Sequence, residues 1–544
     1  MPKNKLNIPD APRFGTLREL IEYITQRYGD TPAFILPQDD GSEIEKSFTA
    51  FAGDIGALGA ALFGQGLRDC RVALLGENSY EWIISYFAVA NGGNTVVPLD
   101  RDLPAGDLAP LVEASGCTAL IYARSFRDIL PAFQSGTSVR RYICMDELEA
   151  LLAQGRQLLG QGDTAYTACP LSPDTLAAIV YTSGTTGSPK GVMLTHTNIA
   201  GDAASICRMS GGAGTCVLML PLHHTFGLTG GLIIPLMYGV TSYLGRSLRT
   251  IQKDMVRMHA TVALLVPAMV EAMHKKIRDA AEEKGSGGKL RMGLKLSRLL
   301  MKLGIDARRR LFKEVLAPLG GELNLIVCGG APLNKRIAAD YYAMGVDLLN
   351  GYGITECSPV VSVNPNHPRN RLGSVGKPLD CCEVRIGSPD ENGVGEILIK
   401  GSNVMRGYYG DEHATGEAFT DDGWFKSGDL GYLDRDGYLY VTGRIKHLII
   451  LSNGKNVSPE ELEERVKLLP GVLETAVYGA RDKIVAEIYA EPGTEEALRG
   501  AVKAMNNALP PYKQIAAVKF RGAPFPKTTT MKIKKHSLKE NDDA

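Results

Sequence analysis

The chain has 544 residues, with 60 Lys and Arg against 60 Asp and Glu and a net charge of zero. A content of 44% hydrophobic and 22% charged residues is typical of a folded globular protein and excludes a disordered chain. The length fits two to four domains. The charge balance argues against a dedicated nucleic-acid-binding protein, so we expect no nucleic acid as a partner.

The ten cysteines form no C-x-x-C pair and no Cys/His cluster with zinc-ligand spacing, which is typical of reduced thiols in the cytoplasm. The N-terminus lacks the apolar segment of a signal peptide, and no apolar run reaches the ~18 residues of a membrane span. We therefore expect a cytoplasmic protein, and peripheral contact with the inner face of the membrane stays open.

Apolar strands alternate with helices through the first part of the chain. Helices are predicted at 16–29 and 48–66, a strand–helix–strand unit at 71–100, strands at 117–123 and 175–184, and a helix at 192–205. This alternation predicts an α/β fold with a largely parallel sheet.

The pattern of predicted elements changes from about residue 380. There, short strands separated by Gly and Asp turns predict a small β-rich unit. From 458 onwards helices alternate with short strands, as in a compact α+β domain. We expect a large N-terminal domain of mixed α/β layers at 1–443 that includes the β-rich unit, a hinge at 444–446, and a small mobile α+β domain at 447–544.

One segment, 275–313, is strongly basic. It holds thirteen Lys and Arg against four Asp and Glu, a local net charge of +9, and its leucines Leu294, Leu296, Leu299, Leu300 and Leu303 lie among the cations. Two interpretations stay open: a surface that meets anionic lipid or an acidic partner, or a helix that packs its leucines on the body of the protein.

The motif that indicates a chemical function most specifically is Tyr181–Gly191, YTSGTTGSPKG, which follows an apolar strand. A loop of Gly, Ser and Thr exposes backbone N–H groups and hydroxyls to a polyphosphate, and Lys190 adds a point charge. It is not a Walker P-loop, because Gly191 rather than Ser or Thr follows the lysine.

With this motif the sequence resembles the adenylate-forming superfamily, which includes acyl-CoA synthetases, luciferases and peptide-synthetase adenylation domains. Five further segments match in the family's order: Pro221–Gly227 (PLHHTFG), Gly329–Pro332 (GGAP), Gly351–Glu356 (GYGITE), Trp424–Asp429 (WFKSGD) and Gly443–Lys446 (GRIK). A sixth, Pro526–Ile533 (PKTTTMKI), lies near the C-terminus.

The resemblance implies ATP, Mg²⁺ and CoA as reactants. It implies catalytic roles for Lys532, Thr185, Glu356 and for His224 as an acyl-site gate, with Mg²⁺ held by Glu356 and Thr182. Lys446 is implied as the hinge pivot, and Gly454 as part of the CoA path. The residues implied to bind the nucleotide are Thr182, Ser183, Gly184, Thr186, Gly187, Lys190, Gly330, Ala331, Gly351, Tyr352, Gly353, Thr355, Asp429 and Arg444.

Two residues depart from the family's pattern. Met531 stands where members commonly have a glycine before the catalytic lysine, and His447 stands where the hinge often continues with Asp. We expect both to tune the reaction.

The carboxylate substrate is indicated by the stretch 223–239, which contains no acidic residue that could bind a substrate ammonium group. An uncharged acyl tail is therefore favoured, and the basic insertion resembles that of bacterial long-chain fatty acid–CoA ligases in particular. Two alternatives stay open: a ligase that loads the fatty acid onto acyl carrier protein, and an ATP-binding homologue without catalysis.

Overall fold

The computed structural model describes residues 8–182, 189–245, 250–451, 455–480 and 483–527, together with Ile533 and Lys535. The chain forms two compact units. Unit 1 comprises Met1–Leu372, Gly376–Glu383 and Lys400–Phe425, and unit 2 comprises Gly373–Val375, Val384–Ile399 and Lys426–Ala544. The hinge that the sequence indicates at 444–446 stays a prediction.

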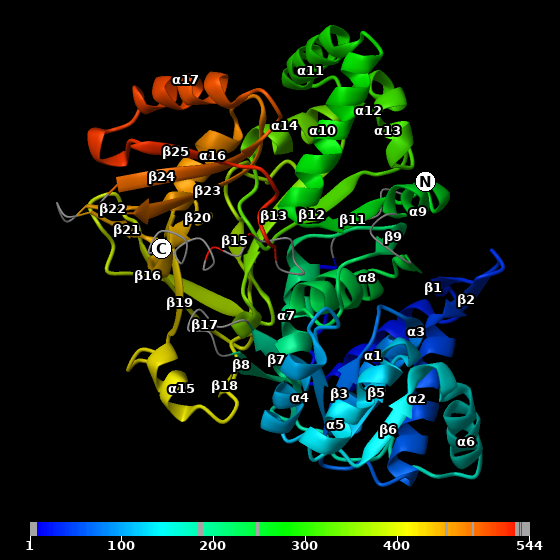
Figure 1. Cartoon of the computed structure of the whole chain (residues 1–544). Coiled ribbons are helices and arrows are strands. Elements are labelled where there is room, and N and C mark those ends of the chain that lie inside the picture. Colours follow the sequence, from blue (N-terminus) through cyan, green and yellow to red (C-terminus); the bar gives the residue numbers. More distant parts are fainter. Residues whose placement is uncertain are drawn as a thin grey trace. The chain divides into compact units, whose positions relative to one another are not determined.

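A nine-stranded sheet dominates unit 1, with the order β15-β14-β13-β12-β11-β9-β10-β1-β2 (Figure 1). The strands from β13 to β1 are parallel, and antiparallel strands form both edges. The bounds are β1 (Pro32–Pro37), β2 (Glu43–Ser47), β9 (Thr215–Leu218), β10 (Thr241–Leu244), β11 (Val262–Leu265), β12 (Leu325–Cys328), β13 (Asp347–Gly353), β14 (Val360–Val363) and β15 (Lys377–Pro378).

The second sheet of unit 1 has seven strands in the order β18-β8-β7-β4-β3-β5-β6. The strands from β7 to β6 are parallel, whereas β8 and β18 are antiparallel. The bounds are β3 (Arg71–Leu75), β4 (Thr95–Pro98), β5 (Ala119–Tyr122), β6 (Arg141–Cys144), β7 (Leu176–Thr182), β8 (Lys190–Thr195) and β18 (Gly407–Tyr408). The predicted α/β class with largely parallel sheets is confirmed.

Fifteen α-helices connect these strands in the described part of unit 1. They are α1 (Leu17–Tyr28), α2 (Phe48–Gly64), α3 (Tyr80–Asn91), α4 (Ala105–Ala114), α5 (Leu130–Gly136), α6 (Leu148–Gly160), α7 (His196–Met209), α8 (Ile234–Met237), α9 (Ile251–Arg257), α10 (Pro267–Glu283), α11 (Gly287–Lys302), α12 (Arg308–Leu311), α13 (Lys313–Leu316), α14 (Lys335–Met344) and α15 (Glu412–Ala418). None of the described helices combines the length and the apolarity needed to cross a bilayer.

Helix α1 illustrates how local sequence sets these boundaries. The Thr16 side chain accepts a hydrogen bond from the backbone N–H of Glu19, and Gly29 ends the helix with a φ of 52°. Its apolar residues at helical spacing, among them Leu17, Leu20 and Ile24, are buried. The helix predicted at 16–29 is confirmed.

The helix predicted at 192–205 is wrong in its first part. Lys190–Thr195 is strand β8, which pairs antiparallel with β7, and α7 begins only at His196. The Thr195 side chain caps α7 by accepting from the Asn198 N–H, while the Asn198 side chain accepts from the Thr195 N–H. The apolar run at 190–195 is too short for its periodicity to distinguish a helix from a strand. Pairing with β7 therefore decides that it is a strand.

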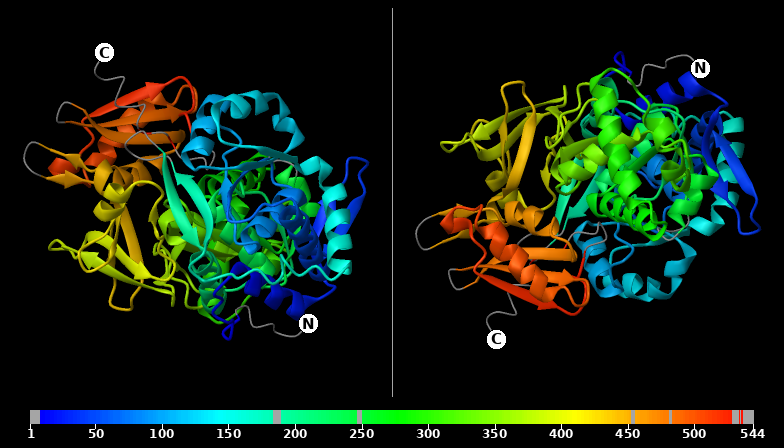
Figure 2. Two further views of the ribbon diagram at one scale, coloured as in Figure 1. Left: turned by 90° about the horizontal axis from the view of Figure 1, so that it is seen from below. Right: turned by 90° about the horizontal axis from the view of Figure 1, so that it is seen from above.

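In its described residues, unit 2 is built from three small sheets and two α-helices, which are drawn in yellow to red in Figure 2. Most of a four-stranded sheet, β16-β17-β19-β20, belongs to it, with a two-stranded and a three-stranded sheet. The bounds are β16 (Cys382–Gly387), β17 (Gly395–Gly401), β19 (Phe425–Leu433), β20 (Leu439–Arg444), β21 (Ile449–Ile450), β22 (Asn456–Val457), α16 (Pro459–Lys467), β23 (Val472–Ala480), β24 (Lys483–Ala490), α17 (Glu495–Asn506) and β25 (Ala517–Arg521). The predicted β-rich unit and C-terminal α+β domain are confirmed as elements of the fold.

Candidate active site

The two ends of the predicted phosphate loop lie opposite each other. Thr182, the last residue of β7, pairs in register with Lys190, the first residue of β8. The intervening loop residues Ser183, Gly184, Thr185, Thr186 and Gly187 lie outside the described residues, so their roles stay predictions. Both ends belong to adjacent antiparallel strands.

Glu356 and Lys190 approach the same tyrosine. The Tyr408 hydroxyl donates a hydrogen bond to the Glu356 carboxylate at 3.0 Å, and the Lys190 ammonium lies 4.8 Å from the centre of the Tyr408 ring. Strand β18 holds Tyr408 by pairing it with Val192 of β8. Burial and the neighbouring Glu356 raise the pKa of Tyr408, so its hydroxyl stays a donor. The sequence analysis missed Tyr408; the only local signal is a pair of tyrosines between glycines, Gly407–Gly410.

The two glycine-rich motifs predicted to hold adenine are brought together by parallel strands. Strand β12 ends at Cys328 and lies beside β13, with Cys328 opposite Asn350, so the motifs leave the same sheet edge. Gly330 has a φ of 86°, in the left-handed region. A Cβ on Gly353 would lie 2.1 Å from the Pro359 carbonyl oxygen, so this close approach requires glycine. The predicted residues gathered here are Gly330, Ala331, Gly351, Tyr352, Gly353 and Thr355.

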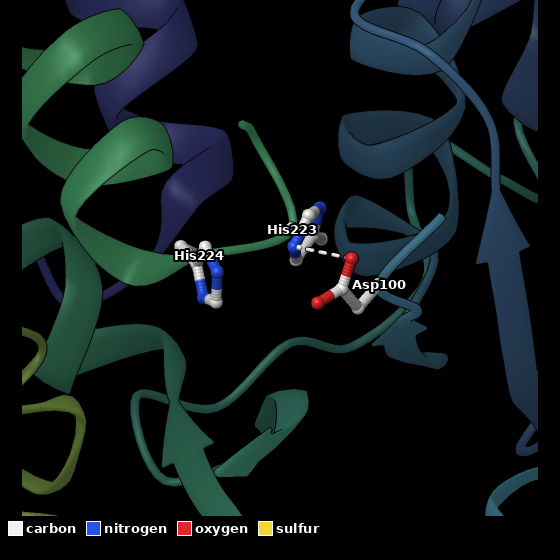
Figure 3. A group of neighbouring side chains, drawn as sticks. All are labelled: Asp100, His223 and His224. Atoms are coloured by element: carbon white, nitrogen blue, oxygen red, sulfur yellow. Dashed lines mark ion pairs between the residues drawn. The ribbon is translucent and has the colours of Figure 1, made fainter. Parts of the chain in front are cut away.

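His224 lies in a loop that two side chains from the first hundred residues hold in place. The Asn78 side chain donates to the Leu220 carbonyl oxygen at 2.8 Å and accepts from the Leu222 N–H at 3.1 Å. The Asp100 carboxylate lies 3.4 Å from the His223 ring, and Figure 3 shows the two side chains facing each other. The sequence analysis missed these contacts, because no motif surrounds Asn78 or Asp100.

The same loop gathers an electrostatic cluster. Burial acts to raise the pKa of Asp100, but the neighbouring His223 lowers it to about 2. The ligand atoms of Asp100, His223 and His224 lie within 4.8 Å of one another, close enough to share one divalent ion. In Figure 3 the His224 ring lies beside that of His223, and the ring centres are 4.2 Å apart. The contact between Asp100 and His223 holds the loop that carries His224 in place.

A π-helix, η3 (Phe226–Ile233), follows this loop directly. A Cβ on Gly227 would lie 2.1 Å from the Pro221 carbonyl oxygen, so the helix can approach the loop this closely only with glycine. π-Helices occur frequently at functional sites. The conformation brings Phe226 and the glycines of η3 against the nine-stranded sheet.

A narrow cavity of about 110 Å³ lies between η3 and the nine-stranded sheet. It follows the strands from their amino ends, at Val262 and Leu325, to their carboxyl ends, at Gly329 and Gly330. Four strand residues rise about 13 Å. None of the described residues that line the cavity is charged. Gly351, Tyr352 and Gly353, which belong to the predicted adenine site, are among the residues that line it.

In unit 2, Asp429 and Arg444 form an ion pair. They are opposite residues of the antiparallel strands β19 and β20, and the Arg444 Nε lies 2.8 Å from the Asp429 carboxylate. Asp429 is only 3% exposed, whereas Arg444 is largely exposed. Gly428 turns the chain before Asp429 with a φ of 68°. Both residues were predicted to bind the nucleotide, and the sheet places them together.

The residue after the predicted hinge contacts helix α16. His447, the residue that departs from the family's pattern, lies 2.7 Å from the Glu460 carboxylate of α16. Burial acts to raise the pKa of Glu460, but the hydrogen bond from His447 and the charge of Lys535 lower it to about 2. Lys446, the predicted pivot, lies beside His447 in a 3₁₀ turn, Ile445–His447.

The predicted catalytic lysine, Lys532, and Gly454 of the CoA path lie outside the described residues. The residues around Lys532 are nevertheless anchored to unit 2. Lys527 pairs with Glu474 at 2.5 Å and forms an isolated β-bridge with Ile533. Lys535 lies 2.9 Å from the Glu463 carboxylate. The terminal segment is therefore attached to unit 2 on both sides of Lys532.

Several known proteins are similar to this chain in sequence and fold. The family model described as "AMP-binding enzyme" matches residues 21–409, and the chain therefore belongs to the AMP-binding enzyme family. It is 29% identical to the long-chain-fatty-acid–CoA ligase of Yersinia pestis, over 98% of this chain and 95% of that protein. It is 30% identical to the feruloyl-CoA synthase of an Amycolatopsis species, over 77% of each. The ATP-bound MatB structure from Rhodopseudomonas palustris is 26% identical, with a TM-score of 0.75, over 96% of this chain and 98% of that one.

Proposed function

We propose that this protein activates a long-chain fatty acid with ATP and transfers it to CoA, with release of pyrophosphate and AMP. Acid–CoA ligase chemistry through an acyl adenylate follows from membership of the family and from relatives named as CoA ligases and synthases. The choice of a fatty acid rests on one observation: a cavity without charged lining residues, whose wall includes Gly351–Gly353 of the predicted adenine site. A charged or amino-bearing tail would lose its hydration there without finding a partner.

The first half-reaction forms the acyl adenylate. Charge builds up as a carboxylate oxygen attacks the α-phosphorus of ATP and pyrophosphate leaves, so cations and N–H donors must surround that phosphorus. Lys190 and the loop 183–187 hold the phosphates, and Lys532 contributes the catalytic cation. Asp429 accepts the ribose hydroxyls, and Arg444 adds donors.

Magnesium fits the oxygen donors available in unit 1. Glu356 is half-buried, and its carboxylate is already oriented by Tyr408. With a hydroxyl from Thr182 it forms the hard oxygen ligand set that Mg²⁺ prefers. When bound, the ion neutralises phosphate charge, while Tyr408 keeps Glu356 in one orientation.

The second half-reaction transfers the acyl group to CoA. We propose that the segment 447–544 turns about Arg444–Lys446, withdraws Lys532 and opens a path past Gly454 for the thiol. The thiol sulfur attacks the acyl carbonyl carbon, the bond between that carbon and the AMP oxygen breaks, and the thiol proton is lost to solvent. Acyl carrier protein as acceptor, with the same chemistry, is the alternative.

The test is pyrophosphate release from MgATP over a panel of carboxylic acids, with CoA or acyl carrier protein as acceptor. We expect long-chain fatty acids with CoA to give the highest kcat/KM, and sulfonated or amino acids to give little. A maximum for an aryl acid such as ferulate would contradict the proposed substrate but not the ligase chemistry. No pyrophosphate release with any acid, in a protein that still binds ATP, would instead indicate the non-catalytic homologue.

A further inference from the structure

The outer face of α11 carries an apolar stripe. Met292, Leu296, Leu299 and Leu303 follow one another at spacings of 4, 3 and 4 residues, which places them on one side of a helix. Their exposed fractions are 67%, 44%, 56% and 67%. Figure 1 shows α11 at the outer edge of unit 1.

Folding does not require this stripe, because α11 packs through its opposite side. Leu290 and Leu294 pack against the hydrophobic core beneath the nine-stranded sheet. Buried Ser297 donates a hydrogen bond to the Ala343 carbonyl oxygen at 2.6 Å. A surface helix ordinarily has one apolar stripe, facing the core. The second stripe therefore needs another explanation.

The exposed apolar side chains are also concentrated. Thirteen large apolar side chains are exposed in the described part of the chain. Six of them lie within the 20 residues 292–311: the four of the stripe, Ile305 and Leu311. Singly scattered apolar residues are normal on a protein surface, whereas a contiguous group marks an interaction site.

A row of cations borders the stripe. Arg291, Lys295, Arg298 and Lys302 repeat the spacing of 4, 3 and 4 residues, and all four are exposed. The arginines are paired with Glu282 and Asp340. Within the described residues, Lys295 and Lys302 form no ion pair. Helix α11 contains no Asp or Glu, so all its side-chain charges are positive.

We propose that the outer face of α11 docks on an anionic lipid surface. A 16-residue helix with apolar and cationic rows side by side lies in the plane of a bilayer interface, with its leucines among the acyl chains and its lysines at the headgroups. Each Lys or Arg near an anionic leaflet adds to the attraction between the helix and the headgroups. The inference rests on this surface alone and does not depend on the substrate.

The test measures binding of the full-length protein to vesicles. With vesicles of phosphatidylglycerol and phosphatidylcholine in equal parts, we expect binding that salt weakens; with phosphatidylcholine alone, we expect little. Leu296→Ser with Leu299→Ser should weaken binding about tenfold or more by removing buried methylene groups. Lys295→Glu with Lys302→Glu should weaken it at least as strongly by reversing two charges.

Matched controls change exposed residues elsewhere. Leu372→Ser with Val256→Ser removes two exposed apolar side chains, and Lys467→Glu with Lys503→Glu reverses two exposed charges. Both controls should bind like the unaltered protein. Equal losses in the controls, or vesicle binding that both α11 variants retain, would overturn the proposal. So would an absence of vesicle binding together with acyl carrier protein binding that the α11 variants lose, because the face would then serve a protein.

Discussion

The Tyr408 hydroxyl donates a hydrogen bond to the Glu356 carboxylate, with 3.0 Å between the two oxygens. The residues are 52 positions apart in the chain, and the pairing of β18 with β8 brings them together. The same ring lies 4.8 Å from the Lys190 ammonium. Tyr408 therefore links the predicted metal ligand to the predicted phosphate-binding lysine.

We predict that Tyr408→Phe raises the Mg²⁺ concentration needed for half-maximal adenylation about fivefold. A single hydrogen bond contributes roughly 1 kcal/mol, and the ring that faces Lys190 is retained. Glu356→Gln should cost on the order of 100-fold in kcat/KM, because it removes the ligand itself. The measurement is a Mg²⁺ titration of pyrophosphate release. Tyr409→Phe is the control, and an equal shift in that variant would contradict the role of Tyr408.

We predict that substitutions at the two ends of the cavity change the dependence of activity on fatty-acid chain length in different ways. A Cβ on Gly212 would lie 3.0 Å from Val262 at the far end, so Gly212→Val should reduce activity with the longest fatty acids and spare shorter ones. A Cβ on Gly231 would lie 3.3 Å from Leu264, nearer the carboxyl ends of the strands and the predicted adenine site, so Gly231→Ile should reduce activity with all chain lengths. The measurement is kcat/KM over the acid panel.

The control for these cavity variants is Gly500→Ile in α17, where an added Cβ meets nothing within 4 Å. It should leave the chain-length profile unchanged. Melting temperatures of all three variants separate cavity effects from unfolding. An unchanged profile in a folded Gly212→Val variant would show that the acyl chain does not occupy this cavity.

We predict that Lys532→Ala abolishes acyl-adenylate formation and spares thioester formation from supplied acyl-AMP. The lysine neutralises charge at the α-phosphorus, which matters only in the first half-reaction. Lys534→Ala is the control two positions along the chain, and it should retain both half-reactions. Equal losses of the two half-reactions in Lys532→Ala would show that the assigned role is wrong.

We predict that His196 makes unit 1 sensitive to mild acid. Burial lowers the pKa of His196 to about 4, and its ring nitrogen accepts the Leu17 N–H at 3.2 Å. The unfolded chain binds the proton near pH 6.5, so the stability from neutral His196 is complete above pH 6.5 and is lost as pH falls towards 4. Between pH 7 and pH 5 the loss is on the order of 2 kcal/mol.

The measurement is the free energy of unfolding against pH. His196→Gln cannot take up the proton and keeps an acceptor for Leu17, so the slope between pH 7 and pH 5 should flatten. His413→Gln is the control, because His413 is 85% exposed beside Glu417. A slope that stays steep in His196→Gln would refute the assignment.

The sequence analysis identified residues that lie within short motifs and missed those that act across the fold. Glu356 was found because GYGITE is contiguous in the chain. Tyr408, Asn78 and Asp100 were missed because strand pairing and loop packing decide their contacts. Short-range patterns carry no information about which distant residue a side chain meets.

Helix α11 shows the same division within one segment. The sequence marked Leu294 and Leu296 alike as leucines among cations. The structure packs Leu294 on the core and leaves Leu296 exposed. Successive helical residues are rotated by about 100° around the helix axis. Leu294 and Leu296, which are two residues apart, therefore lie on nearly opposite faces. Only the docking of α11 on the body determines which face is covered.

The amino-acid sequence by itself determined the α/β class, most element positions and the family, because these depend on local periodicity and contiguous motifs. The tertiary structure decided that Tyr408 holds Glu356, that Asp100 and Asn78 fix the loop of His224, and that the cavity runs along the strands uncharged. It also decided which side of α11 is exposed. That side carries apolar and cationic side chains, although the net charge of the whole chain is zero. The reason is physical: a site is a set of distances between remote residues, and packing sets those distances.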